Sequence, residues 1–218
     1  MIRYLKVLGL VVAFTCALGA PVPEAGATPF QFHTETIPSK ITGKQHSGNE
    51  VIGTNGGNIS CSEVTQEGDA SGTTTVSVTL TATYSECTAF GFMKVPFNMN
   101  ECHITFTAIT REGTAYEGKK DIACLTKPIE ILVPGCTVTI GSQNNLGKIT
   151  YTNIGSGSTR EVTIDSAING IKYVEHNSGL FPTCASNEIE TSNGTATGSM
   201  LLTAELPLIK THHAFFVG

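Results

Sequence analysis

Residues 73–84 read TTTVSVTLTATY, and this stretch decides the fold class. Apolar residues occupy the even-numbered positions from Val76 to Tyr84, whereas Thr and Ser occupy the odd-numbered positions between them. This two-residue period predicts a β-strand with one buried and one solvated face. It also favours antiparallel pairing, because strands of buried parallel sheets are apolar on both faces.

The same alternation recurs along the rest of the chain. It predicts further strands over 103–110, 137–141, 149–152, 160–165, 171–175 and 200–209, the last one bent at Pro207. Gly170, between two of these strands, is expected to mark a bulge or a tight turn. The chain holds 31 Thr and 23 Gly, and no stretch after residue 28 sustains a helical apolar period. We therefore expect an all-β fold with almost no helix, either an antiparallel β-sandwich or a barrel-like sandwich.

The first 27 residues have the features of a cleaved signal peptide. Arg3 and Lys6 precede an apolar run over 7–20, and Ala25-Gly26-Ala27 is a small-x-small cleavage site. The apolar run is shorter than the roughly 18 residues that span a bilayer, and no later segment is long enough, so we expect no transmembrane anchor after cleavage. The mature chain, residues 28–218, is expected to form one domain, with two lobes that divide near 125–135 as the alternative.

Six cysteines follow the signal peptide, and an even number in an exported protein predicts three disulfide bonds. They are Cys61, Cys87, Cys102, Cys124, Cys136 and Cys184. Five share the parity of inward-facing neighbours, as Cys102 does with Ile104, whereas Cys87 breaks the parity of its strand. Because thiols that point into a core are shielded from solvent, the pattern favours structural bridges over a reactive nucleophile.

The pairing of the cysteines is not fixed by their number, since six cysteines allow fifteen pairings. Our working hypothesis is the sequential one, Cys61–Cys87, Cys102–Cys124 and Cys136–Cys184. The sequence contains neither Cys-x-x-Cys nor Cys-x-Cys, which argues against a structural zinc site. Asp69, Asp121 and Asp165 are the only aspartates, so an Asp-rich calcium loop is not expected either.

Motifs of catalysis are absent or incomplete. Residues 113–119 (GTAYEGK) match the first part of a phosphate-binding loop, but Lys120 follows where the Mg²⁺-binding Ser or Thr should stand, and we interpret the stretch as a hairpin turn. No nucleophile elbow, Ser-x-x-Lys or His-Glu-x-x-His motif occurs. His212 and His213 are neighbours on a strand and point to opposite faces, so they make a poor chelate. The sequence therefore predicts no catalytic, cofactor-binding or metal site.

Three aromatic residues follow Cys87 in a turn-like stretch: Phe90, Phe92 and Phe97. An exposed aromatic group at this place would stack on sugar rings or anchor a partner. We favour the interpretation that these rings fill the core at the entrance of a strand. The chain has no Trp, which offers the largest stacking surface for sugars.

Several strings resemble an uncharacterised family of exported, cysteine-paired β-proteins of soil actinobacteria, for which no activity is known. They are FHTET (32–36), ISC (59–61), YSECTAFGF (84–92), NMNEC (98–102), and TREVTI (159–164) with INGIKY (168–173). The resemblance covers most of the mature chain. It implies secretion and a disulfide frame, and it transfers no catalytic residue.

Two classes of function remain. We favour a secreted, non-catalytic β-domain that is structural, adhesive or ligand-binding, is extracellular or loosely associated with the cell envelope, and has a surface glycan or a protein as its partner. The alternative is a secreted hydrolase that acts on glycans or cell-wall material with a site assembled from distant residues. The net charge of −5 argues against nucleic acid as a partner. A pocket with two carboxylates, or a Ser/His pair within hydrogen-bond distance, would favour the hydrolase.

Overall fold

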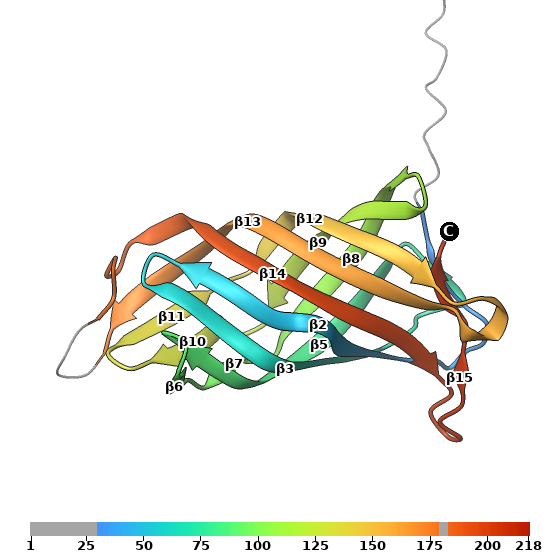
Figure 1. Ribbon diagram of the computed structural model, residues 1–218, viewed down its shortest axis with the longest axis horizontal. Coiled ribbons are helices and arrows are strands. Elements are labelled where there is room, and N and C mark those ends of the chain that lie inside the picture. The colour runs from blue at the N-terminus through green and yellow to red at the C-terminus, as the bar shows by residue number, and fades with distance from the viewer. Residues whose placement is uncertain (1–29, 179–182) are drawn as a thin grey trace, which may run out of the picture.

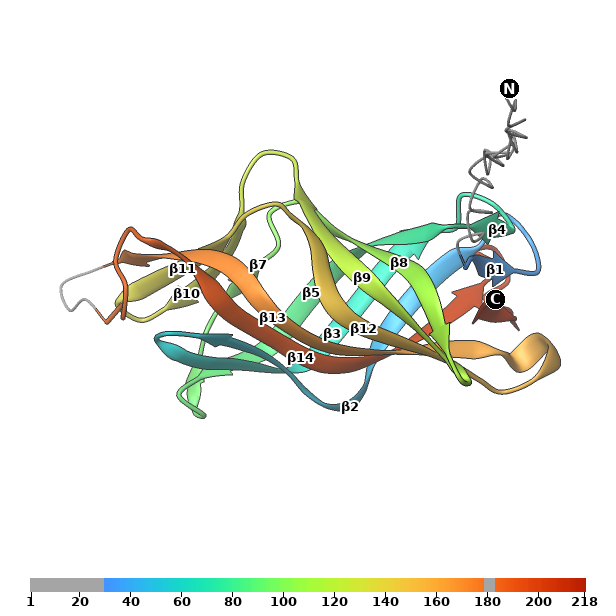
Figure 2. The same ribbon diagram turned by 90° about the horizontal axis from the view of Figure 1, so that it is seen from above.

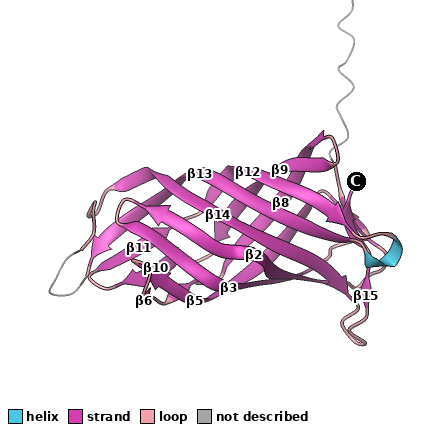
Figure 3. Ribbon diagram, viewed as in Figure 1, coloured by secondary structure: helices cyan, strands magenta, loops and turns pink. Residues whose placement is uncertain are grey.

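The computed structural model describes residues 30–178 and 183–218 of the chain. The expected signal peptide, residues 1–27, lies outside the described residues. Strands make up nearly all of the regular structure, together with one 3-10 turn, η1 (Gly157–Thr159) (Figure 3). The expectation of an all-β fold with almost no helix is confirmed. No helix in the described part of the chain is long and apolar enough to cross a membrane.

Eight strands are long. They are β2 (Lys40–Thr54), β3 (Gly57–Asp69), β5 (Ser77–Ala89), β8 (Cys102–Glu112), β9 (Ala115–Cys124), β12 (Gln143–Ile154), β13 (Glu161–Asn177) and β14 (Glu190–Glu205). They pair antiparallel in the order β2-β3-β5-β8-β9-β12-β13-β14, and β14 pairs back with β2 (Figure 1). The large sheet therefore closes in a ring around one core.

The shorter strands extend this ring at its two ends. They are β1 (Phe32–Thr34), β4 (Thr74–Thr75), β6 (Met93–Lys94), β7 (Phe97–Asn98), β10 (Ile129–Val133), β11 (Cys136–Ile140), β15 (His212–His213) and β16 (Phe215–Val217). At one end the sheet branches, because β13 pairs with β12 along its first part and with β11 along its last residues. The branch continues through β10 to β7, and this branching makes the assembly a ring rather than a barrel. At the opposite end β1, β4 and β16 form a separate small sheet (Figure 2).

Strand β5 has the two faces that the threonine alternation predicted. Val78, Leu80 and Ala82 are buried, whereas the three threonines from Thr79 to Thr83 are exposed. Val76 was expected to face inward with them but is 45% exposed. It lies between β4 and β5, outside both strands, so no neighbouring strand holds it against the core.

Cys87 faces the core although it breaks the parity of its strand. Glu86, immediately before it, has a φ of +47°, in the left-handed region, and the pairing of β3 with β5 omits the pair Ser62–Glu86. The buried positions of β3 also change parity between Cys61 and Val64. Both strands thus shift by one position at the same place, and Cys87 lies opposite Cys61 inside the ring.

Two predicted strands belong to one element. The runs 160–165 and 171–175 are both part of β13, and the pairing of β13 with β14 shifts between Asn169 and Ile171. Gly170 has a φ of +80° there, so it marks a bulge and not a turn. The strand predicted over 200–209 also differs, because β14 already begins at Glu190 and ends at Glu205. Pro207 lies in the following turn instead of bending the strand.

Candidate functional site

Disulfide bonds brace the ring, as expected for the six cysteines. Cys61 is bonded to Cys87 between β3 and β5, and Cys102 to Cys124 between β8 and β9. In both cases the partners lie directly opposite each other on neighbouring strands. The third bond joins Cys136, the first residue of β11, to Cys184 in the segment before β14. Three disulfides are typical of proteins that fold in an oxidising, extracellular-type environment.

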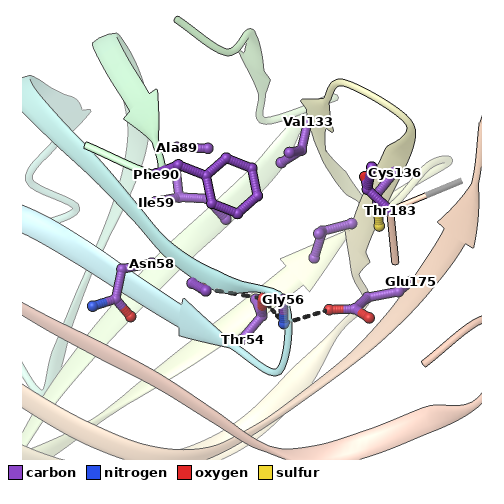
Figure 4. A pocket seen from close by; sticks show the side chains of 12 residues that line it. Thr54, Gly56, Asn58, Ile59, Ala89, Phe90, Val133, Cys136, Glu175 and Thr183 are labelled. Carbon is purple, nitrogen blue, oxygen red and sulfur yellow. Dashed lines mark hydrogen bonds between the residues drawn. The ribbon is translucent and has the colours of Figure 1, made fainter. Parts of the chain in front are cut away.

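A pocket opens at the branched end of the ring (Figure 4). We call it the end pocket. Its lining residues come from the β2–β3 turn, the end of β5, β10, β11, β13 and the segment before β14; they are Thr54, Gly56, Gly57, Asn58, Ile59, Ala89, Phe90, Val133, Cys136, Val138, Glu175 and Thr183. The cavity holds about 20 Å³, and most of its wall is apolar. One carboxylate, that of Glu175, faces it (Figure 4).

Glu175 is only 1% exposed, and backbone amides hold its carboxylate. The Gly56 amide donates to Oε1 at 3.3 Å, and the Ser186 amide donates to Oε2 at 2.8 Å. No Lys, Arg or His nitrogen of the described residues lies within 4.0 Å of it. The carboxylate therefore fixes the β2–β3 turn and the segment before β14 to β13 through hydrogen bonds from neutral donors.

The rim of the end pocket combines an aromatic ring with amide side chains. Phe90 is 52% exposed, and Phe92, two residues further along the chain, is 76% exposed. Asn58, near the start of β3, is exposed and lines the pocket. Asn55, in the β2–β3 turn, accepts a hydrogen bond from Nδ2 of Asn193 at 2.6 Å and donates to Oγ of Ser186 at 3.1 Å, so these two amides stiffen the turn. The rim thus offers an apolar stacking face and the amide of Asn58.

The favoured interpretation of the three phenylalanines as core residues is wrong for two of them. Phe90 and Gly91 both have positive φ, +54° and +81°, and this turn directs Phe90 and Phe92 away from the core between β5 and β6. Phe97 alone packs inward, with its ring stacked on that of Tyr84 at a centroid distance of 4.1 Å. A turn of this kind leaves no signal in the apolar pattern of the sequence.

One group of side chains in the described part of the chain has residue types and spacing that could bind a metal ion. The Sγ atoms of Cys136 and Cys184 and a carboxylate oxygen of Glu175 lie within 4.8 Å of one another. The two sulfurs are bonded to each other, however, and a disulfide does not supply the thiolates that bind a metal. The group is therefore a structural bridge beside a buried carboxylate.

A serine and a histidine do come within hydrogen-bond distance. Ser39 Oγ lies 2.7 Å from Nε2 of His213, and both residues are buried. The Ser39 hydroxyl also lies 2.7 Å from the Thr36 carbonyl and donates to it, so its single proton is committed and Nε2 of His213 must be the donor to Oγ. The pair meets the distance named above for a hydrolase. A base that donates to its serine cannot activate it, however, so the pair lacks the proton arrangement that a nucleophile needs.

A second arrangement resembles a catalytic triad in its order. Thr139 Oγ1 lies 3.3 Å from Nε2 of His176, and Nδ1 of His176 lies 2.9 Å from Oε2 of Glu188. The three residues lie on the outer side of β11 and β13, where Glu188 is exposed, and none of them lines the end pocket. The Thr139 hydroxyl is also 3.3 Å from the Val174 carbonyl, a competing acceptor for its proton.

Other predicted features have the positions that their spacing suggested. Gly113 and Thr114 form the turn between β8 and β9, so the stretch resembling a phosphate loop lies in a hairpin. His212 is exposed whereas His213 is buried, on opposite faces of β15. That the chain has no catalytic residue remains a prediction.

Sequence reasoning did not single out the buried charged residues. Glu175 continues the inward parity of Ile171 and Tyr173, which was visible in the sequence. Lys120 continues that of Tyr116 and Ile122 on β9, but it stood within the apparent phosphate loop. For Glu175 and for Lys120, the signal in the sequence was an ionisable residue at a position that the strand alternation predicts to face inward.

Comparison with known proteins gives no relative for this arrangement. No family model, no curated protein and no solved structure matches the chain. What the chain does must therefore be argued from its own residues.

Proposed function

We propose that this chain is a secreted, non-catalytic binding domain that recognises a surface glycan at the end pocket. The observation that carries the proposal is that the exposed ring of Phe90 and the exposed amide of Asn58 both line the end pocket. Sugars are bound by stacking of their apolar faces on aromatic rings together with hydrogen bonds to planar polar groups. The disulfide Cys136–Cys184 and the carboxylate of Glu175 hold this rim in place.

The location that we propose is extracellular or loosely associated with the cell envelope. Support comes from the three disulfides, from the signal-like first 27 residues and from the resemblance to exported proteins of soil actinobacteria. We propose membership of that family on the strings quoted above. Its members would share the frame of disulfides and strands.

The test is binding of the disulfide-intact protein to purified peptidoglycan and to an array of defined glycans. We expect retention on at least one of these materials, and loss of it in the double variant Phe90→Ala/Phe92→Ala. Leu208→Ala is a matched control, because Leu208 is 96% exposed in the turn after β14, away from the end pocket. Equal retention of the double variant and the wild type would refute the site. If the chain is retained on a protein partner and on none of the glycans, the ligand of the end pocket is a protein and not a glycan.

A secreted hydrolase is the second candidate, and one observation favours it. The hydrogen bonds from Thr139 through His176 to Glu188 have the order of nucleophile, base and orienting acid. If this arrangement were catalytic, the protein would hydrolyse a fluorogenic ester and His176→Ala would abolish the activity. Activity that is absent, or equal in the wild type and in His176→Ala, removes this candidate.

A further inference from the structure

A second cavity lies inside the ring, apart from the end pocket. Isoleucines from six strands form most of its wall: Ile52, Ile104, Ile122, Ile129, Ile140 and Ile171. Three polar groups share this apolar space, namely the side chains of Glu50, Tyr84 and Lys120. Charged residues are rare at such positions unless they are paired.

Lys120 is buried without a charged partner. It is 4% exposed on the inward face of β9, and no carboxylate oxygen of the described residues lies within 4.0 Å of its ammonium. A lysine side chain that lines an apolar cavity places its amine where it can act as a nucleophile on a small ligand.

Glu50 supplies a carboxylate to the same cavity. It is 6% exposed, and the Tyr84 hydroxyl donates to its Oε1 at 3.1 Å. Gly198 on β14 leaves the room that Glu50 occupies, since a Cβ at position 198 would lie 3.0 Å from Cγ of Glu50. Burial, and then the charge of Glu50, hold the pKa of the Tyr84 phenol well above its usual value, so the phenol stays protonated and keeps donating.

We propose that this cavity captures a small aldehyde as an imine on the ε-amino group of Lys120. This proposal stands independently of glycan binding at the end pocket. An amine that adds to a carbonyl needs a partner that takes up a proton and later returns it, and Glu50 is the carboxylate that lines the cavity with Lys120.

The steps balance without any further reactant. A proton passes from the Lys120 ammonium to Glu50 across the cavity that both residues line, and the free amine forms a bond to the carbonyl carbon while the C=O pair moves to oxygen. A proton passes from nitrogen to that oxygen, which gives a carbinolamine. Glu50 then protonates the hydroxyl, which leaves as water, and the nitrogen lone pair forms the C=N bond. One aldehyde and one ammonium thus yield one iminium ion and one water.

The dimensions of the cavity set the class of aldehyde. Its volume is about 30 Å³, roughly two to three times the 10–15 Å³ that a cavity needs, by the same kind of measure, to hold one water molecule. Only an aldehyde of one or two carbons enters without displacing side chains. Tyr84 and Phe97, whose rings stack on each other, are the half-buried residues of the wall, so they mark the side on which the aldehyde enters.

Reductive trapping tests the proposal on the unmodified protein. The disulfide-intact protein is treated with limiting acetaldehyde and cyanoborohydride, and ethylated lysines are identified by peptide mapping. We expect Lys120 to be modified before the exposed Lys94 and Lys119. Burial alone predicts the opposite order, so modification of Lys120 after these two lysines, or not at all, would overturn the proposal.

Two variants separate proton transfer from simple access. Glu50→Gln keeps the shape of the side chain and is expected to slow modification of Lys120 by at least about tenfold, with no change at Lys119. Lys119→Met is the matched control, because Lys119 is exposed beside Lys120, and it should leave modification of Lys120 unchanged. An unchanged rate at Lys120 in Glu50→Gln would refute the role of the carboxylate.

Discussion

The two ends of the ring are held together by different means. At the end covered by β1, β4 and β16, the ring of Phe32 stacks on Phe215 at 5.9 Å and meets the edge of Tyr151 at 5.5 Å. At the branched end, two disulfides and the buried carboxylate of Glu175 hold the turns, and Phe90 stays exposed. Disulfides and hydrogen bonds thus stabilise the branched end while Phe90 stays accessible to a ligand. At the opposite end, which we call the packed end, aromatic side chains fill the space.

The largest effect is expected at the packed end. Phe32 is 1% exposed, so Phe32→Ala removes a buried ring and leaves a cavity. We expect a loss of about 3–5 kcal/mol in the free energy of unfolding, measured by urea denaturation with the disulfides intact. Phe92→Ala is the matched change at the branched end and should cost less than about 0.5 kcal/mol, because Phe92 is exposed. Similar losses for the two variants would contradict the comparison.

The second effect concerns the covalent bracing of the branched end. Cys61 and Cys87 are 26 residues apart, and the chain-entropy model predicts about 3.5 kcal/mol of stabilisation from a bridge that closes such a loop. We expect the double variant Cys61→Ala/Cys87→Ala to lose about this much in urea denaturation.

The control for this variant is a thiol titration of the denatured, unreduced wild type. It should find almost no free thiol among the six cysteines. Two or more free thiols per chain would mean that the bridges do not form, and the branched end would then lack the bracing on which the comparison rests.

The smallest effect is a pH dependence that comes from two buried phenols, one at the packed end and one inside the ring. Burial raises the pKa of the Tyr151 hydroxyl at the packed end and of the Tyr84 hydroxyl inside the ring. Both phenols stay protonated in the folded protein, whereas in the unfolded chain they ionise near pH 10. Stability is therefore full below pH 10 and falls above it, by up to about 1.4 kcal/mol per pH unit for each phenol.

The measurement is the urea midpoint between pH 9 and pH 11. Tyr151→Phe should reduce the loss of unfolding free energy per pH unit above pH 10 by the contribution of one phenol. A slope that is unchanged in Tyr151→Phe would show that this hydroxyl ionises equally in the folded and unfolded chain.

The sequence predicted local features well where side chains alternate without interruption. Strand β5 is an example, since its threonines and apolar residues keep one parity over most of its length. Strand β2 was not predicted, because its pairing with β3 is interrupted between Lys44 and Glu50, around Gly48 with its φ of +64°. A bulge in the middle of a strand erases the period on which the prediction depends.

The candidate sites were less visible than the strands. The end pocket depends on a turn that exposes Phe90, and the interior cavity brings Glu50 of β2 together with Lys120 of β9. The β2–β14 pairing that closes the ring, such as Lys40 opposite Glu205, joins residues from the two ends of the described chain. No local pattern reports contacts of that kind, because they depend on which strands become neighbours.

The closing pair of strands also sets an order of events during folding. The bridges Cys61–Cys87 and Cys102–Cys124 span 26 and 22 residues, so their partners meet early in folding. The pairing of β2 with β14 cannot form before β14 is present, and contacts between residues so distant in sequence form slowly. Until then the edges of β2 and β14 are open for pairing with other chains. A chain cut before β14 would keep the cysteines of all three bridges and lose its ring, and we would expect it to aggregate through the free edge of β2.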